Sequence, residues 1–353
     1  MNADFVPAHL ATARSKIDAD MGAVLVVIPT LNEAAHIAAV INGLRPFSER
    51  AASAGRKVTI VVVDGGSLDG TRDIVARLQA SFDGLHLLNN PARLQSAAVN
   101  LAVSQFAKDA AWLIRIDAHA RYPEDYCDIL LDEAEATAAD SVVVAMRAIG
   151  ETPFQRAAAL AQNTRIGNGG AAHRSAPAGA RVEHGHHALM RLDAFCAMGG
   201  YDAGFSHNED AELDRRLVAS GRKIWLTGRT GLGYIPRRSV TALARQYFNF
   251  GRGRAQTQLK HRIWPRLRQT LPIAVLPAVL LALLAPLHPL FALPAVLWLS
   301  ACLAGGLVLA LQGHGWTGLP AGAIAALMHL AWSCGFWSGL ATGSVAQVSR
   351  AAP

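Results

Sequence analysis

Residues 58–79 read VTIVVVDGGSLDGTRDIVARLQ, and this stretch decides the fold class of the chain. Its first half is a run of β-branched residues typical of a buried strand, and its second half has the spacing of a helix. The same alternation continues through AVLVVIP (23–29), NEAAHIAAVINGL (32–44), LHLLNN (85–90), SAAVNLAVSQF (96–106), AWLIRID (111–117) and SVVVAMRA (141–148). This order predicts an α/β domain with a mostly parallel sheet and helices on both faces.

Polar residues follow three of the predicted strands. These strands run into Pro29-Thr30-Leu31-Asn32-Glu33, Asp64-Gly65-Gly66-Ser67 and Asp117-Ala118-His119. Ligands of open parallel sheets bind at the carboxyl ends of the strands. Helix capping by Asn32 and Ser67 is the alternative, and it accounts for Glu33. It does not account for Asp64 or Asp117, so we interpret this edge of the sheet as a ligand site.

Asp117 and His119 are candidate metal ligands. Side chains two positions apart point the same way from an extended segment. An oxygen of Asp117 and a nitrogen of His119 are then placed to share one divalent cation. A strand end that turns into solvent is the alternative reading of the same residues.

The sequence excludes two common nucleotide-binding classes. A dinucleotide-binding dehydrogenase needs G-x-G-x-x-G after the first strand, and a P-loop enzyme needs its own glycine-rich loop. The first turn here is PTLNEA, and the second, DGGSLDG, has its glycines in a different pattern. Neither motif is present.

Charge and hydropathy divide the chain into two parts. The averages, a pI of about 9.6 and a mean hydropathy of +0.23, hide this division. No Asp, Glu, Lys or Arg occurs from Leu271 to Ser349. The apolar run 271–311 is about two membrane crossings long, and a third run covers about 319–340. A large buried helical core is the alternative, and the absence of charge makes a membrane segment the favoured interpretation.

A basic segment precedes the apolar part. Residues 252–268 contain Arg252, Arg254, Lys260, Arg262, Arg266 and Arg268 and no acid. Such a segment is expected to stay cytoplasmic and to contact anionic lipids of the inner leaflet, with Trp264 near the interface. A nucleic-acid-binding patch is the alternative, and it fits poorly beside a membrane segment, so we expect no nucleic-acid partner.

The remaining features complete the expected organisation. The four cysteines form no C-x-x-C pair, which favours a reducing compartment for the first part of the chain. Residues 1–21 lack the apolar core of a secretory signal. We therefore expect an N-terminal extension (1–21), a catalytic domain (22–240), a basic amphipathic segment (241–270) and about three transmembrane helices (271–345).

Seven motifs together carry a resemblance to a known family. They are PTLNE, VVVDGGSLDGT, NPARLQSAAVNLA, IRIDAHARYP, GHHALMR, GGYDAGFSHNEDAELDRRL and RQYFNFGRGRA, in this order over about residues 22–260. The set resembles inverting glycosyltransferases of family 2, which have the GT-A fold, and within them the ExoA-like branch of succinoglycan biosynthesis.

The resemblance implies roles for the strand-end residues. Pro29, Thr30, Asn32 and Glu33 match the first nucleotide-binding turn. Asp64 matches the carboxylate that recognises uracil, Gly65 and Ser67 belong to the adjoining loop, and Arg93 matches a basic residue near the nucleotide. Asp117 occupies the first position of the family's D-x-D and is implied to hold a divalent metal, Mn²⁺ or Mg²⁺. His119 replaces the second acid, which favours Mn²⁺.

The later motifs imply the reacting groups. Glu209 and Asp210 match the family's E-D pair, in which the Asp is the general base, and Asn208 is placed to cap the helix that starts there. Gln246, Arg252 and Arg254 loosely resemble the Q-x-x-R-W element of processive relatives, and the altered spacing makes processive synthesis unexpected.

The loop 166–187 is rich in glycine and histidine and is expected to act as a lid over the substrates. His184, His186 and His187 are either ligands of a second metal or hydrogen-bonding groups for phosphate or sugar.

Together these features predict a membrane-anchored, inverting glycosyltransferase. Its expected substrates are a nucleotide sugar, a UDP-hexose by resemblance, and a lipid-linked saccharide, and its expected location is the inner membrane with the catalytic domain in the cytoplasm. A polyprenyl-phosphate sugar synthase is the alternative within enzymes. A non-catalytic membrane scaffold or a transporter subunit is the alternative from another class.

Overall fold

The structure of the chain is a computed structural model that describes residues 22–169, 179–265 and 267–351. It divides into two compact units, Met1–Met146 with Ser175–Tyr234, and Arg147–Arg174 with Ile235–Pro353. The expected extension at 1–21, and residues 170–178 of the expected lid, lie outside the described residues.

One mixed sheet organises the first unit. Its strands are β1 Ala23–Thr30, β2 Val58–Asp64, β3 Leu85–Asn89, β4 Ala110–Arg115, β5 Ala120–Arg121, β6 Ser141–Ala148, β7 Ala180–Val182, β8 His186–Arg191 and β9 Ile224–Tyr234. The spatial order is β3-β2-β1-β4-β8-β6-β9-β5, with β7 beside β9. The strands β3, β2, β1 and β4 are parallel, as predicted, and β8 pairs antiparallel with both β4 and β6. The polar ends of β1, β2 and β4 therefore meet at one edge.

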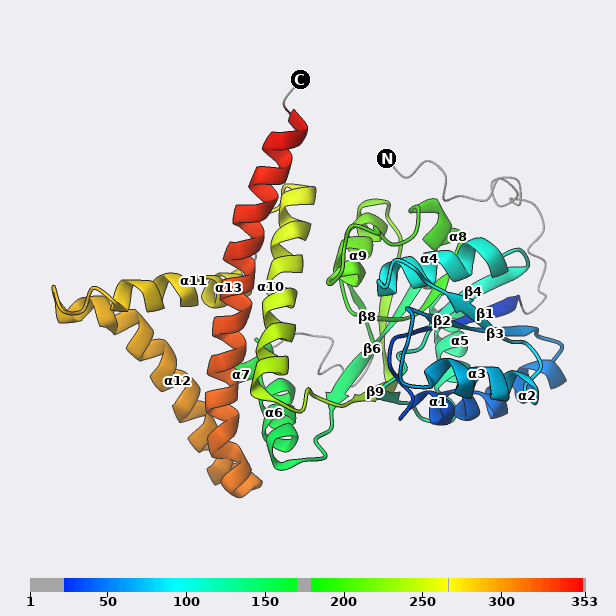
Figure 1. Cartoon of the computed structure of the whole chain (residues 1–353), viewed down its shortest axis with the longest axis horizontal. Coiled ribbons are helices and arrows are strands. Elements are labelled where there is room, and N and C mark those ends of the chain that lie inside the picture. The colour runs from blue at the N-terminus through cyan, green and yellow to red at the C-terminus, as the bar shows by residue number, and fades with distance from the viewer. Residues whose placement is uncertain (1–21, 170–178, 266, 352–353) are drawn as a thin grey trace. The chain divides into compact units, whose positions relative to one another are not determined.

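Helices cover both faces of this sheet (Figure 1). They are α1 Ile37–Gly43, α2 Arg45–Ser53, α3 Thr71–Gln79, α4 Gln95–Phe106, α5 Tyr126–Thr137, α8 Leu192–Ala197 and α9 Glu209–Ala219. Leu25 and Val27 of β1 belong to the core cluster that includes residues of α4, α8 and α9. Val26 and Ile28 point to the other face and are equally buried. The predicted arrangement of helices on both faces is confirmed.

Two local predictions were wrong, and one strand was missed. The helix expected over 32–44 begins only at Ile37, because residues 32–36 form turns that bind the neighbouring loop. The strand expected to reach Asp117 ends at Arg115, and residues 118–119 form a turn. Strand β8 was not predicted, because its sequence HHALMR mixes histidines with apolar residues.

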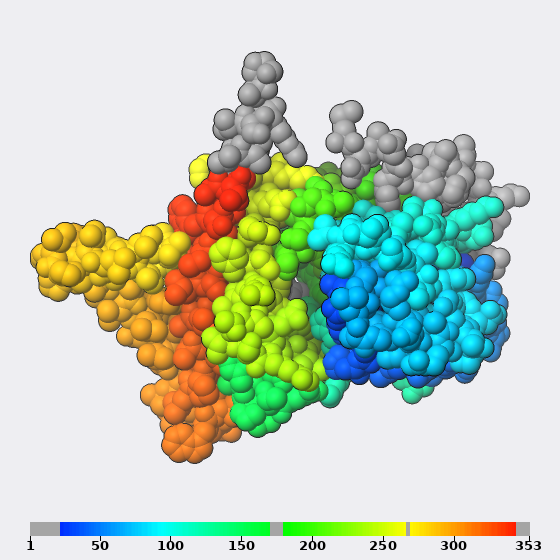
Figure 2. Space-filling view, viewed as in Figure 1, coloured from blue at the N-terminus to red at the C-terminus, as the bar shows by residue number. Residues whose placement is uncertain are grey.

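The second unit is helical. It contains α6 Pro153–Asn163, α7 Arg165–Asn168, α10 Val240–His261, α11 Leu267–Ala282, α12 Leu293–Leu309 and α13 Gly318–Ala351. Two short 3-10 helices, η3 Pro289–Ala292 and η5 Gly315–Thr317, and one short π-helix, η4 Ala310–His314, connect them. In Figures 1 and 2, the tip of the hairpin formed by α11 and α12 (yellow to orange) stands away from α13. This tip is apolar, and Leu283 and Leu287 are 72% and 77% exposed there.

Serine and tryptophan side chains supply a hydrogen-bond donor that the backbone of α11 lacks. Pro277 has no N–H, so the carbonyl of Ile273, four residues earlier, lacks its helical donor. Ser333 Oγ and Trp337 Nε1 of α13 donate to this carbonyl at 3.0 and 2.9 Å. The Leu276 N–H in turn donates to Ser333 Oγ at 3.0 Å. These bonds satisfy polar backbone groups within a segment that has no charged side chain.

Glycines allow α10 and α13 to pack at very short range. A Cβ atom on Gly335 of α13 would overlap the carbonyl oxygen of Phe248, and one on Gly251 of α10 would overlap that of Trp332. A Cβ atom on Gly343 would meet only the end of the Leu259 side chain. Small residues of this kind let two helix backbones approach each other.

Among the described residues, one helical stretch is long and apolar enough to cross a membrane, Pro289–Gly343. A shorter apolar helix covers Gln269–Ala282. These lengths and compositions give the second unit a candidate membrane segment, although the sequence predicted about three crossings.

The packing of α10 against α13 predicts unequal effects of two Gly→Ala substitutions. Alanine gains up to about 1 kcal/mol of helix propensity over glycine. At Gly335 the overlap with backbone outweighs this gain, and we expect a loss of about 1–3 kcal/mol. At Gly343 the flexible Leu259 side chain moves aside, so stability should change little. Thermal unfolding of the detergent-solubilised chain tests this, and equal midpoints for the two variants would contradict the close packing.

Candidate active site

The loops that follow β1 and β2 are tied to each other. The backbone N–H of Asn32 donates to Ser67 Oγ at 2.7 Å, and the N–H of Leu68 donates to Asn32 Oδ1 at 2.9 Å. The N–H of Glu33 donates to Thr71 Oγ1 at 2.9 Å. Asn32 adopts a φ of 55°, in the left-handed region that asparagine tolerates better than most residues. These hydrogen bonds define the shape of the candidate nucleotide turn.

The end of β1 is held by two hydrogen bonds to backbone groups. The carbonyl of Thr30 accepts a hydrogen bond from the Gly65 N–H at 2.8 Å, and Thr30 Oγ1 donates to the carbonyl of Ile28 at 2.9 Å. Pro29 lies within β1 opposite Val63. These residues therefore fix where the turn leaves the sheet.

Asp64 holds its own loop. Its Oδ2 accepts from the N–H groups of Gly66 and Ser67 and from Arg72 Nη1 at 2.9, 3.0 and 3.0 Å, and its Oδ1 accepts from Ser67 Oγ. Burial raises the pKa of Asp64, but the hydrogen bonds from Ser67, Arg72 and Gly66 outweigh burial and lower it. Both oxygens serve the loop, so recognition of uracil by this carboxylate stays a prediction.

Arg93 brings positive charge to the same loop. Its side chain lies next to Gly66, where an added Cβ would be 3.2 Å from Arg93 Nη2. Gly66 has a φ of 86°, so a larger residue there is disfavoured by both conformation and space. Arg93 is exposed, and its predicted place beside the nucleotide stays a prediction.

Asp117 lies at the centre of the sheet edge. Its Oδ1 accepts from Gln95 Nε2 at 3.2 Å, and its Oδ2 lies 3.3 Å from His186 Nε2. Burial raises the pKa of Asp117, but the charges of Arg115, His186 and His119 lower it well below its usual range. The carboxylate is therefore ionised at neutral pH.

His119 pairs with an acid of another loop. Its Nδ1 lies 2.9 Å from Glu33 Oε1. The turn at 118–119 replaces the extended geometry from which the shared direction of Asp117 and His119 was expected. The charge of His119 still contributes to the lowered pKa of Asp117.

The two residues fit a divalent cation by their chemistry. An ionised carboxylate and an imidazole are a donor pair that Mn²⁺ accepts. Among the described residues, no group of three or more His, Cys, Asp or Glu side chains is arranged to hold a metal. The predicted role of Asp117 and His119 as metal ligands therefore stays a prediction.

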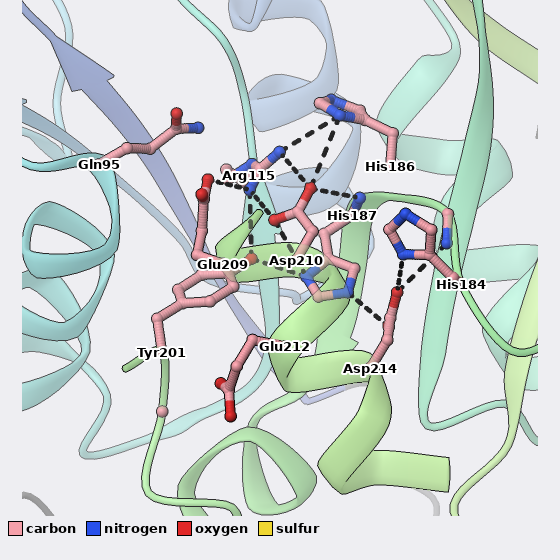
Figure 3. A network of polar contacts seen from close by, with 12 residues as sticks. Gln95, Arg115, His184, His186, His187, Tyr201, Glu209, Asp210, Glu212 and Asp214 are labelled. Carbon is pink, nitrogen blue, oxygen red and sulfur yellow. Dashed lines mark hydrogen bonds and ion pairs between the residues drawn. The ribbon is translucent and has the colours of Figure 1, made fainter. Parts of the chain in front are cut away.

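A buried arginine, Arg115, connects the acids of this edge (Figure 3). Its Nη1 and Nη2 donate to Asp210 Oδ1 and Oδ2 at 2.5 and 3.0 Å, and its side chain is only 2% exposed. It also lies 3.7 Å from Asp117 and 3.8 Å from Glu209. Sequence reasoning missed this residue. An arginine two positions before Asp117, within an otherwise apolar strand, was the signal that could have found it.

Glu209 and Asp210 stand at the start of α9, as predicted. Asn208 is the N-cap residue, but its side chain makes no capping hydrogen bond. Burial raises the pKa of both acids. The charges of Arg115 and His187 more than reverse this for Asp210, whose pKa falls well below its usual range. For Glu209 the charge of Asp210 adds to burial and raises the pKa to about 7. Adjacent carboxyl groups with separated pKa values are typical of acid–base sites.

His187 is enclosed by two acids of α9. Asp210 and Asp214 are four residues apart and face the same side of the helix. His187 Nε2 lies 2.6 Å from Asp214 Oδ1, and His187 Nδ1 lies 2.7 Å from Tyr201 Oη and 3.5 Å from Asp210 Oδ1. Burial lowers the pKa of His187, but the charges of Asp214 and Asp210 raise it overall. His187 thereby contacts both acids on the side of α9 that carries Asp210.

The histidines of 184–187 do not form a second metal cluster within the described residues. His184 Nδ1 lies 2.7 Å from Asp214 Oδ2, whereas His186 faces Asp117 and Arg115. Of the three, His186 faces the predicted metal residue, and hydrogen bonding of these side chains to phosphate or sugar stays a prediction. Roles for Gln95, Tyr201 and Asp214 were not predicted, because their meeting depends on the tertiary fold.

Gln246, Arg252 and Arg254 belong to α10 of the second unit. Their predicted part in nucleotide binding stays a prediction.

Comparison with known proteins gives a consistent result. The model of the family "Glycosyl transferase family 2" matches residues 25–198. The chain is 51% identical over 313 residues to the succinoglycan biosynthesis protein ExoA of Rhizobium meliloti (strain 1021), covering 89% of this chain and 93% of that protein.

Two solved structures share the fold. One is the mannosyltransferase PcManGT from Pyrobaculum calidifontis in complex with GDP-Man and Mn²⁺, at 19% identity and a TM-score of 0.55, covering 88% of this chain and 86% of that one. The other is GalNAc-T7 with UDP, GalNAc and Mn²⁺, at 16% identity and a TM-score of 0.51, covering 74% of this chain and 51% of that one.

The buried pair of His187 and Asp214 predicts a pH-dependent stability. Because the folded-state pKa of His187 is raised, the stabilisation from its charge is complete below about pH 6.5 and is lost as the pH rises through the raised value. We expect Asp214→Asn to cost about 3–5 kcal/mol at pH 6, because it leaves a buried charge without its partner. The pH dependence of unfolding above pH 6.5 should also flatten.

Urea unfolding of the solubilised chain at several pH values measures both effects. Asp193→Asn, at an acid that pairs with Arg191 on the surface, is the matched control. A variant Asp214→Asn with wild-type stability and pH dependence would contradict a buried ion pair.

Proposed function

Because the chain belongs to glycosyltransferase family 2 and to its ExoA-like branch, we propose that it transfers a hexose from a UDP-hexose to a lipid-linked saccharide in polysaccharide or glycolipid synthesis. The observation that carries this proposal is the position of Asp117 and Asp210 on either side of the guanidinium of Arg115. One acid suits the diphosphate side of a donor and the other suits the hydroxyl of an acceptor. Arg115 holds the two at a fixed spacing.

Asp210 is the proposed general base. An acceptor hydroxyl loses its proton as it attacks, and an ionised carboxylate within hydrogen-bond reach takes that proton. The lowered pKa keeps Asp210 in the accepting, ionised form. Arg115 and His187 hold the carboxylate in place before the acceptor arrives. Attack from the side of the sugar opposite the leaving diphosphate inverts the anomeric centre. Glu209, the adjacent acid, is a candidate partner in handling this proton.

The loops that follow β1, β2 and β4 are proposed to bind the leaving nucleoside diphosphate. Asp117 and His119 would hold a divalent cation, Mn²⁺ or Mg²⁺, which when bound neutralises charge that develops on the diphosphate. Arg93 adds a cation beside the β2 loop, and Arg252 and Arg254 are further candidates. Asn32 and the backbone of 64–67 are the proposed cradle of the nucleoside, with Asp64 as candidate for the uracil.

We also propose that the second unit anchors the enzyme in the inner membrane with the catalytic unit in the cytoplasm. The apolar stretch Pro289–Gly343 and the exposed leucines at the tip of α11 and α12 support this, because water disfavours such surfaces. The division at 22–240, 241–270 and 271–345, with about three crossings and a basic segment on anionic lipids, belongs to the same proposal.

Substitution of the base tests the reaction. Asp210→Asn should lower kcat by about 10²–10⁴-fold, which is the usual contribution of a general base, while UDP binding persists. Membranes that contain each variant, a labelled UDP-sugar and Mn²⁺ provide the assay, and Asp193→Asn is the control for loss of a surface acid. Near-normal transfer by Asp210→Asn would favour a polyprenyl-phosphate acceptor, whose phosphate needs no base.

Substitution at the donor side tests the nucleotide. Asp117→Ala should abolish stimulation by Mn²⁺ and weaken binding of UDP, because the carboxylate beside the diphosphate is removed. Calorimetry with UDP measures this, and a screen of UDP-glucose, UDP-galactose and GDP-mannose identifies the donor. A wild-type chain that binds none of these nucleotides would contradict the proposed function and support a scaffold.

A further inference from the structure

Glu33 and His119 form a contact whose purpose the proposed reaction does not explain. They lie 86 positions apart in the sequence, and Nδ1 of His119 is 2.9 Å from Oε1 of Glu33. The two side chains are 18% and 36% exposed. A partly exposed polar contact of this kind adds little to stability. Its position beside the candidate cation residues makes a functional role the better explanation.

The backbone on both sides of this contact is fixed. The N–H of Glu33 donates to Thr71 Oγ1, and its carbonyl accepts from the N–H groups of His36 and Ile37, each at 2.9 Å. Glu33 is therefore hydrogen-bonded to the first residue of α3 and to the start of α1.

The histidine is held equally from its own side. His119 precedes β5, in which Ala120 pairs with Tyr234 of β9. The ring of Tyr234 meets the imidazole edge-on, with centroids 6.4 Å apart. The imidazole thus lies between a carboxylate and an aromatic ring that both come from ordered elements.

The contact also selects a tautomer of the imidazole. A carboxylate accepts hydrogen bonds only, so Nδ1 of His119 carries a proton and donates it to Glu33. In the neutral ring the lone pair then belongs to Nε2. Histidines that bind metals commonly donate their other N–H to a carboxylate, which orients the ring and makes it a better ligand.

We propose that Glu33 is a positioning residue that holds His119 in the tautomer and orientation in which Nε2 binds the divalent cation beside Asp117. This rests on the cation of the proposed function and deepens it. Glu33 then acts through His119. The nucleotide turn that carries Glu33 thereby helps to position a residue that binds the cation. Loss of Glu33 should weaken binding of the cation and leave binding of the acceptor unchanged.

A double-mutant cycle tests this proposal. Mn²⁺ affinity is measured by electron paramagnetic resonance in the presence of UDP for the wild type, Glu33→Ala, His119→Ala and the double variant. We expect Glu33→Ala to weaken Mn²⁺ binding by about 10–100-fold, the usual effect of removing such a partner. It should have no further effect, within about twofold, in the His119→Ala background, because a residue that acts through His119 has nothing left to orient.

Two more measurements sharpen the result. Nitrogen coupling to Mn²⁺ should be present in the wild type and lost in His119→Ala. Glu33→Gln, which keeps an acceptor oxygen, should recover part of the affinity, and Glu49→Ala, at an exposed acid of α2, should bind Mn²⁺ like the wild type.

Three outcomes overturn the inference. Wild-type affinity in Glu33→Ala removes the positioning role. An equal loss from Glu33→Ala with and without His119 means that Glu33 binds the cation by itself. A wild-type chain that binds Mn²⁺ no better with UDP than without it overturns both this inference and the donor site of the proposed function.

Discussion

The bidentate ion pair, or fork, between the guanidinium of Arg115 and the carboxylate of Asp210 is the interaction on which the rest of the site depends. A buried guanidinium is stable only when its charge is paired. Asp210 supplies that pairing from α9, while Arg115 comes from β4 in the middle of the sheet. The fork therefore fixes the start of α9 over the carboxyl end of β4. Removing either partner would leave an uncompensated charge inside the domain.

The acids around this ion pair differ in their pKa values. Asp210 faces Arg115 and His187 and stays ionised, whereas Glu209, next to it in sequence, is raised to a pKa of about 7. Asp117 lies on the other side of the guanidinium and is ionised as well. Arg115 thus favours the ionised form of Asp210 and Asp117, whereas burial and the charge of Asp210 raise the pKa of Glu209. The buried ion pair of His187 and Asp214 supports this arrangement from the next turn of α9.

In the second unit, the main constraint is to satisfy backbone hydrogen bonds and to pack apolar helices closely. Its apolar helices contain prolines that remove helical hydrogen bonds, and Ser333 and Trp337 of α13 replace the missing donors of α11. The glycines of α10 and α13 bring the basic helix against the long apolar helix through backbone contact rather than through large side chains. Both features suit surroundings in which an unsatisfied backbone group is costly and apolar surface is not.

The sequence by itself determined the order of elements, the parallel half of the sheet, the apolar segment and the polar ends of β1, β2 and β4. Local patterns decide these features, because strand and helix periods and strand-end residues are written in consecutive positions. It did not determine that Asp64 serves its own loop, that His119 faces Glu33, or that Arg115 joins Asp117 to Asp210. These contacts join residues that are distant in sequence, or depend on a turn at 118–119 that the pattern of an apolar strand does not reveal. Only the packed sheet and α9 bring such side chains within reach, and their pKa values follow from that proximity.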